Sequence, residues 1–144
     1  MEHLDRRKVA DIAQMLLRLS DGSEEAGLSA SRAGLADDFL LAAVRSEQDR
    51  RSKRHKLLGV ERDVFADPGW DILLELFFAR LAGTRMSSST IGLEAGIPQS
   101  TALRWLGYLH GLGLVERIQD VQDRRRQWVA LTDKAAAGLR RCFV

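Results

Sequence analysis

The sequence predicts a mainly α-helical fold with one small antiparallel β-hairpin toward its C-terminal end, an α+β arrangement. Three observations support this prediction. Apolar residues recur at steps of three and four over several stretches, which is the spacing of amphipathic helices. Two short alternating stretches between Leu114 and Leu131 flank a polar loop, as the strands of a hairpin do. Gly96 and Pro98 stand between two short helical stretches, which predicts a tight turn that joins two helices.

The composition excludes several classes of protein. A chain of 144 residues with 45% hydrophobic content fits one domain, or one domain with an attached dimerisation element. Because no apolar stretch is long enough to span a bilayer and the first residues lack a signal-peptide core, we expect a cytoplasmic protein without a membrane partner. A single cysteine and three scattered histidines predict no disulfide, no metal site and no cofactor. No phosphate-binding loop or catalytic motif stands in a suitable context, so we do not expect an enzyme.

Residues 1–66 form the less regular half of the chain. The stretch from Asp5 to Leu19 has the apolar spacing of an amphipathic helix, which needs a partner surface. The stretch from Ser20 to Gly34 is rich in Ser, Gly and Ala, which predicts a connector, and a helix is expected to resume near Asp37. The apolar stripe could pack on its own domain or on a second copy of the chain. We favour the second copy, so this region is expected to make a homodimer.

A basic run, Arg50 to Lys56, leaves two interpretations open. It can be a solvated helix face supported by pairs such as Glu47 with Arg51. It can also be a flanking contact to phosphates, since basic side chains along a helix add non-specific affinity for nucleic acid.

Residues 67–144 are predicted to form a second, more regular domain. Asp67 and Pro68 are a strong helix start and Gly83 a plausible stop. The intervening residues are almost all apolar, so this helix is expected at the centre of the core. Residues 84–86 are expected to form a short third strand, and Thr132 to cap a final helix from Asp133 to about Cys142.

Two short helices are predicted between Ser87 and Gly113. Ser87 can cap the first, and Gly96 provides the turn. The outward face of the second helix is small, polar and singly basic. Such a face can enter a DNA major groove, where Arg pairs with guanine and Gln with adenine. The inward positions are Ile91 and Ala95 in the first helix and Ala102, Trp105, Leu106 and Leu109 in the second, and the outward ones are Gln99, Ser100, Leu103, Arg104 and Gly107.

The predicted hairpin follows directly. Its strands are 114–118 and 128–131, and its tip, Asp120 to Gln127, carries three consecutive arginines. Three guanidinium groups beside such a helix can hold phosphates or enter a narrow minor groove. From Thr84 onward the chain has nine Lys and Arg against five Asp and Glu, a difference of +4, whereas the whole chain carries only +2. The positive excess therefore lies with the predicted DNA-binding part.

These motifs resemble the winged-helix core of MarR-type bacterial transcription regulators. The resemblance rests on GLVER at 113–117, DVQDRRR at 120–126 and ALTDKAAAGL at 130–139, and it covers roughly the second half of the chain. It implies that Thr101 and Arg104 belong to the recognition helix, and that Asp123 steadies a minor-groove Arg125. Val121 stands where the family usually has proline. Family members generally continue into long C-terminal helices that build the dimer and line an effector pocket. Because this sequence ends at Val144, dimerisation is expected to depend on the N-terminal half, and no effector is assigned.

The sequence thus predicts a winged helix-turn-helix with extra N-terminal helices, and a regulator that binds specific double-stranded DNA in the nucleoid. The alternative is a protein interaction module, in which the winged helix is structural and the apolar N-terminal stripe binds a different chain without direct DNA readout. The predicted DNA-binding residues are Ser87, Ser88, Gln99, Ser100, Thr101, Arg104, Asp123, Arg124, Arg125 and Arg126.

Overall fold

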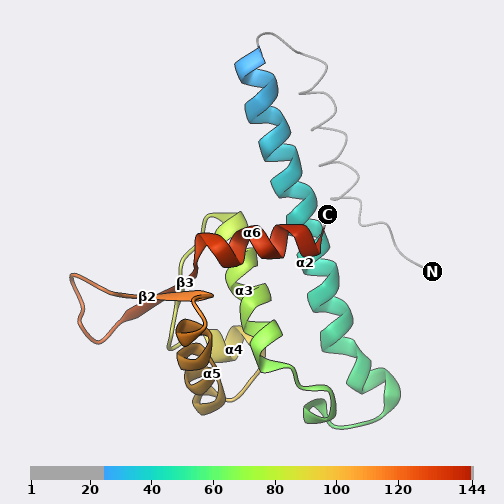
Figure 1. Ribbon diagram of the computed structural model, residues 1–144. Coiled ribbons are helices and arrows are strands. Elements are labelled where there is room, and N and C mark those ends of the chain that lie inside the picture. Colours follow the sequence, from blue (N-terminus) through green and yellow to red (C-terminus); the bar gives the residue numbers. More distant parts are fainter. Residues whose placement is uncertain (1–24, 144) are drawn as a thin grey trace. The chain divides into compact units, whose positions relative to one another are not determined.

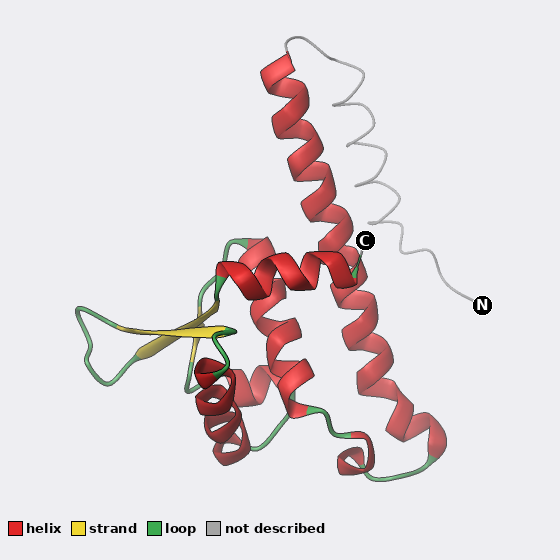
Figure 2. Cartoon of the chain, viewed as in Figure 1, coloured by secondary structure: helices red, strands yellow, loops and turns green. Residues whose placement is uncertain are grey.

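A computed structural model describes the chain from Glu25 to Phe143 (Figure 1). The amphipathic helix predicted between Asp5 and Leu19 lies outside the described residues. The chain divides into two compact units, Met1–Ala42 and Ala43–Val144. The second unit contains a three-stranded sheet and most of the helices (Figure 2). The described elements are α2 (Glu25–Leu58), the 3-10 turn η1 (Arg62–Phe65), α3 (Pro68–Ala82), β1 (Met86–Ser87), α4 (Ile91–Ala95), α5 (Gln99–Gly111), β2 (Val115–Gln119), β3 (Gln127–Leu131) and α6 (Asp133–Cys142).

Helix α2 is longer than the sequence pattern indicated. It begins at Glu25, so the connector predicted from Ser20 to Gly34 is wrong for residues 25–34. The glycines of this stretch suggested a loop, but Ala and Leu, which are strong helix formers, occur between them and outweigh their effect. A Cβ added to Gly34 would meet no atom within 4 Å, so the packing there does not require a glycine.

The C-terminal part of α2 packs on α3 through polar contacts. The Arg51 Nε donates to Asp71 Oδ1 at 2.6 Å, and the Gln48 Nε2 donates to Glu75 Oε1 at 2.8 Å. The predicted pair between Glu47 and Arg51 is therefore not formed. Only 12% of the Arg51 side chain is exposed, because Arg51 lies on the side of α2 that contacts α3.

Helix α3 is the centre of the core, as predicted. The Asp67 carboxylate accepts a hydrogen bond from Trp70 N at 3.3 Å and caps the helix, and Gly83 ends it with a φ of 72°, a backbone conformation that glycine adopts without strain. The inward side chains of α3 are buried: Ile72, Leu74, Leu76, Phe77 and Ala79.

The sheet has the strand order β1-β3-β2, with both pairs antiparallel. The predicted hairpin is confirmed, with Val115 opposite Leu131 at its base and Gln119 opposite Gln127 near its tip. The third strand lies at Met86–Ser87 instead of 84–86, because the residues that pair with Val129 and Trp128 are these two. In chain order, α3 and β1 are followed by the helix pair α4 and α5, and then by the hairpin. This order makes the fold a winged helix-turn-helix.

The start of α4 differs from the prediction. Ser87 does not cap this helix: it ends strand β1, only 7% of it is exposed, and Thr90 occupies the N-cap position. The Ser87 hydroxyl instead lies 2.9 Å from Thr90 Oγ1 and 3.0 Å from Ser89 Oγ. Four residues, 87–90, therefore form a hydroxyl-bonded turn that leads from the sheet into the helix.

Helix α6 is the last element of the fold, and Thr132 caps it as predicted. The Thr132 side chain accepts from Ala135 N at 3.2 Å, and its hydroxyl donates to Gly113 O at 2.8 Å. Ala135, Ala136 and Leu139 are buried. Among the helices from Glu25 onward, none is both long enough and apolar enough to cross a bilayer. The same part of the chain holds no group of three or more His, Cys, Asp or Glu side chains placed to bind a metal ion.

Candidate nucleic-acid interface

The outward face of α5 is polar and nearly flat. Ala102, Leu106 and Leu109 are buried on the inner side of the helix. Ser100, Arg104 and Gly107 are exposed on the other side, as the sequence predicted, and Thr101 lies half-buried at its edge. Leu103 is the one large apolar side chain predicted on this face, and it is 47% exposed. Such a surface presents one cation and two hydroxyl groups, which can donate to the acceptors on base edges in a major groove.

Gln99 is exposed, but its amide already has a partner. The Gln99 Nε2 donates to the Ser88 carbonyl at 2.7 Å, which ties the first residue of α5 to the turn before α4. A Cβ added to Gly92 of α4 would lie 2.7 Å from Gln99 Oε1 and 3.1 Å from Ile97 O. Gly92 therefore allows the close approach of the two helices. Because a bidentate bond to adenine needs both the donor and the acceptor of an amide, Gln99 in this conformation positions α5 instead.

Ser88 links the helix to the hairpin. Its N–H donates to Gln127 O at 2.9 Å, at the start of β3, while its carbonyl accepts from Gln99. One residue thus connects the N-terminal end of α5 to the first residue of β3, at the end of the strand pair nearest the wing tip. The hairpin extends away from the helices (Figure 1). The predicted recognition helix and wing are therefore joined through Ser88.

The tip of the wing is shaped by Asp120. The Asp120 Oδ1 accepts from Gln122 N at 2.9 Å and from Asp123 N at 3.4 Å, and the Asp120 N–H donates to Arg126 O at 3.0 Å. The hydrogen bond from the Gln122 N–H lowers the pKa of Asp120, because it stabilises the carboxylate. Val121, which replaces the family's proline, is 96% exposed and makes no packing contact that the turn needs. The carboxylate fixes a turn that a proline ring would otherwise restrict.

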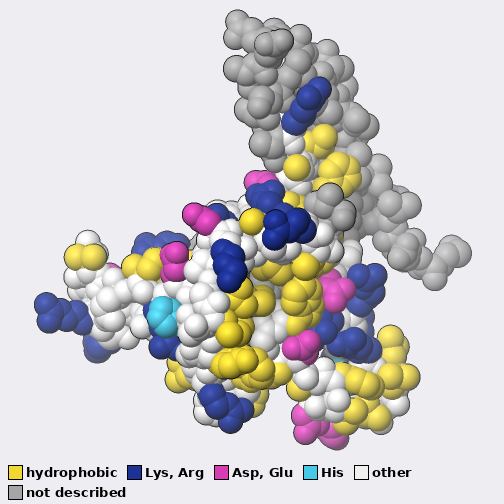
Figure 3. Space-filling view, in the orientation of Figure 1, with side chains coloured by type: hydrophobic (Ala, Val, Ile, Leu, Met, Phe, Trp, Pro, Cys, Tyr) yellow, Lys and Arg dark blue, Asp and Glu magenta, His cyan; other side chains and the backbone are white. Residues whose placement is uncertain are grey.

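Asp123 orients Arg125, as the family resemblance implied. Its Oδ1 accepts from Arg125 N at 3.0 Å and from Arg125 Nε at 3.3 Å. The Arg125 side chain is nevertheless 94% exposed, so its Nη groups project from the tip. Figure 3 shows Lys and Arg side chains at the outer end of the hairpin. The wing therefore presents an oriented cation that is accessible to a ligand.

The other two arginines of the tip differ from each other. Arg124 is exposed, and its carbonyl accepts a hydrogen bond from the Gln119 side chain. The Arg126 guanidinium lies over the Trp128 ring, 5.3 Å from its centroid, and Arg85 lies over the same ring at 4.1 Å. Arg126 thus lies against Trp128 of β3, and Arg124 and Arg125 form the cationic tip of the wing.

Two arginines of this surface were not predicted as site residues. Arg85 stacks on Trp128, and Arg117 of β2 places its guanidinium beside Gly107 of α5. A glycine in the middle of a helix was a usable signal for Arg117, because it often marks a close approach of another group. No signal in the sequence pointed to Arg85.

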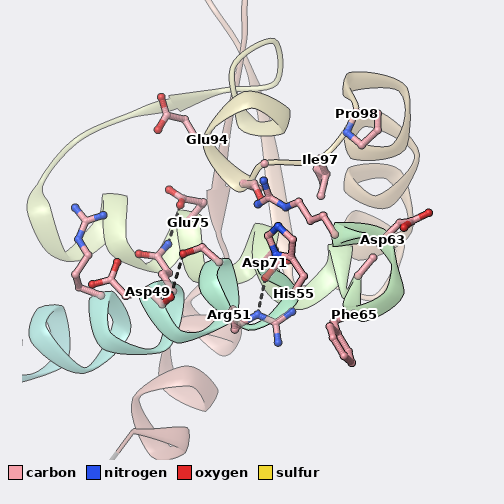
Figure 4. Close-up of a pocket in the computed structure, with 17 residues that line it drawn as sticks. Asp49, Arg51, His55, Asp63, Phe65, Asp71, Glu75, Glu94, Ile97 and Pro98 are labelled. Carbon is pink, nitrogen blue, oxygen red and sulfur yellow. Dashed lines mark hydrogen bonds and ion pairs between the residues drawn. The ribbon is translucent and has the colours of Figure 1, made fainter. Parts of the chain in front are cut away.

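A cavity of about 410 Å³ lies next to the helix-turn-helix, bounded by α2, η1, α3 and α4 (Figure 4). Glu75 lines it, and burial followed by the charge of Glu94 raises the pKa of Glu75 to about 7. Arg62 of η1 donates to the Ala95 carbonyl at 3.5 Å, at the C-terminal end of α4. A Cβ on Gly96 would overlap the Arg62 guanidinium, so this glycine serves both the turn, with a φ of 70°, and the contact with Arg62.

Comparisons with known proteins give structural matches only. No protein-family model matches the sequence, and no curated protein matches it. The chain is similar to the PcaV transcriptional regulator of Streptomyces coelicolor in complex with its natural ligand, at 28% identity over 53% of this chain and 50% of that chain, with a TM-score of 0.44. The chain thus spans about half the length of the PcaV structures it matches.

It is also similar to wild-type MarR from E. coli, at 22% identity over 72% of this chain and 70% of MarR, with a TM-score of 0.46. The matched structures are MarR-type regulators. A MarR variant in complex with operator DNA matches over 72% of this chain and 68% of that chain, at 22% identity and a TM-score of 0.46.

Proposed function

We propose that this chain is a sequence-specific DNA-binding transcriptional regulator. Helix α5 enters the major groove, and the wing tip contacts the backbone or the adjacent minor groove. The observation that carries this proposal is the link through Ser88, which holds the exposed end of α5 and the arginine-tipped hairpin on one surface. Recognition helices contact base edges with residues near their N-terminal ends, and besides Gln99 the exposed polar residues there are Ser100 and Arg104.

Each residue of this surface has a distinct role. Arg104 donates to the O6 and N7 atoms of a guanine, a contact that discriminates against other bases by about 1–3 kcal/mol. Ser100 and Thr101 donate to the backbone or to bases beside it, and Ser88 and Gln99 position the helix. Arg124 and Arg125 bind phosphates or enter the minor groove, with Arg125 oriented by Asp123. Ser87 is buried and acts through the turn that it stabilises.

We further propose that the chain acts as a homodimer through its N-terminal helices. Two copies related by a twofold axis place two α5 helices on half-sites about one helical turn apart, which predicts a pseudo-palindromic operator. Light scattering and the symmetry of the bound sequence measure this directly.

Fluorescence anisotropy with labelled duplexes tests the proposal. We expect the Arg104→Ala, Arg125→Ala double variant to lose most of the affinity and specificity of the wild type. The Arg80→Ala variant is a single-charge control, since the Arg80 guanidinium pairs with Asp133 of α6 and donates to Leu131 O, and is not one of the proposed contact residues. Equal affinity of the double variant and the wild type would refute the DNA-binding surface. Absence of salt-sensitive DNA binding, together with co-purification of a partner protein, would support an interaction module instead.

A further inference from the structure

The outward face of α5 has glycines in place of larger residues toward the C-terminal end of the helix. The positions that point directly away from the core are Ser100, Arg104, Gly107 and Gly111. Glycine weakens the interior of a helix, where Gly107 lies, whereas Gly111 is the last residue of α5. A Cβ added to Gly111 would meet no atom within 4 Å, and one added to Gly107 would meet a single atom, Arg117 Nη2, at 3.2 Å. This end of the stripe is therefore open except for one guanidinium.

The strand register explains how Arg117 reaches α5. Arg117 lies opposite Val129 in the β2–β3 pair, and Val129 is buried against the helices. Residues directly opposite each other in an antiparallel pair point to the same face of the sheet, so Arg117 extends toward the helices as well. Because it is on an edge strand, it remains exposed while its guanidinium lies on the outward face of α5, one turn beyond Arg104.

Arg117 carries a charge that the described part of the chain does not neutralise. No carboxylate between Glu25 and Phe143 forms an ion pair with it. Its neighbour Glu116 lies opposite Ala130, on the other face of the sheet. An exposed guanidinium without a carboxylate partner, on strand β2 of the wing and beside Gly107 of α5, is suited to an external anion.

We infer that Arg117 is a DNA-backbone contact that binds a phosphate between the base pairs read by α5 and the site of the wing. This inference rests on the proposed function. A phosphate is the expected ligand because Arg117 lies past Arg104 toward the C-terminal half of α5, whereas base edges are read from the N-terminal half. The guanidinium fork matches the oxygens of a phosphate, and the glycine stripe lets the strand approach the helix backbone. Arg117 thus contributes affinity to every sequence and no base preference.

The first test measures DNA affinity across a salt series for the wild type, Arg117→Ala, Arg117→Met and Arg117→Lys. Methionine keeps an aliphatic stem over Gly107 without the charge, so it remains informative if the alanine variant folds poorly. We expect Arg117→Met to bind cognate and mismatched duplexes more weakly by the same factor. We also expect its slope of log K against log salt to be shallower by about 0.9, which reduces its deficit about threefold between about 50 and 200 mM salt. Arg117→Lys should keep the wild-type slope, as should the control Arg80→Ala.

The second test locates the phosphate. Single methylphosphonate substitutions along the duplex remove one phosphate charge at a time. We expect one position whose neutralisation weakens binding of the wild type and leaves binding of Arg117→Met unchanged. An unchanged salt slope in Arg117→Met, or full wild-type sensitivity at every phosphate, would overturn the inference. If Arg125→Ala still lowers the slope in that case, the proposed function stands without Arg117. If the wild type shows no salt-dependent DNA binding, both proposals fail.

Discussion

Removal of the Asp123 carboxylate distinguishes two opposite expectations for the DNA affinity of the wing. Simple electrostatics predicts tighter DNA binding, because a negative charge near phosphates is lost. The structure predicts the reverse, since Asp123 Oδ1 holds both the N–H and the Nε of Arg125. An arginine that is not already oriented loses about 0.5–1.5 kcal/mol of side-chain entropy when it becomes ordered on binding. We therefore expect Asp123→Ala to weaken binding by about 2- to 10-fold, and Asp123→Asn by less, because an amide oxygen can still accept from Arg125.

The stability of the fold should hardly change in these variants. The Asp123–Arg125 pair is exposed, and exposed pairs contribute at most about 1 kcal/mol. Anisotropy at constant salt gives the affinity, and urea unfolding gives the stability. Glu116→Ala is the control for charge alone, since Glu116 is exposed on β2 and forms no ion pair with any residue between Glu25 and Phe143. Tighter binding by Asp123→Ala than by the wild type would refute the orientation of Arg125 by Asp123.

Four further variants test the packing around the helix-turn-helix. The pKa of Glu75 is raised from 4.5 to about 7, so the folded chain takes up a proton there and its unfolding free energy should fall as the pH rises through this window. With allowance for solvent screening, the unfolding free energy should fall by about 1–2 kcal/mol. Urea midpoints at pH 5 and pH 8 measure this fall, and Glu75→Gln should remove it. Gly92→Ala should cost about 1–3 kcal/mol because its Cβ would lie 3.1 Å from Ile97 O and 3.2 Å from Gln99 Cα, which are backbone atoms. Gly107→Ala should stabilise α5 by up to about 1 kcal/mol because only a flexible guanidinium must move. Equal midpoints in urea would contradict this contrast. Gln99→Ala should weaken DNA binding without changing base preference, and a changed preference in site selection would show that Gln99 reads a base.

The apolar spacing was sufficient to predict the helices of the second half and the hairpin. The Asp67 cap, the buried face of α3, the turn at Gly96 and the strand pairing follow from local patterns, and each is present. These features depend on residues close in the sequence, where helix and strand periodicities apply directly. The arginines of the wing tip were also found from the sequence, because a polar loop between two strands places its side chains at the surface.

Contacts between distant residues could not be predicted in this way. Ser87 was expected to cap α4, but pairing of β1 with β3 places it in the sheet. Arg51 was expected at the surface, but it donates to Asp71 of α3, twenty residues further along the chain, and so lies between α2 and α3. Gln99 was predicted on the outward face of α5, to read or position on the major groove, and its amide donates to the Ser88 carbonyl. In each case a polar side chain that the pattern left at the surface has a partner from another element.

Selection of bound sites from random duplex DNA tests the central claim most directly. The account predicts enrichment of a pseudo-palindromic sequence with a guanine at the position contacted by Arg104, and loss of preference at that position when Arg104→Ala is selected in parallel. Recovery of no preferred sequence by the wild type, or of the same preference by Arg104→Ala, would contradict the assignment of α5 as the recognition helix.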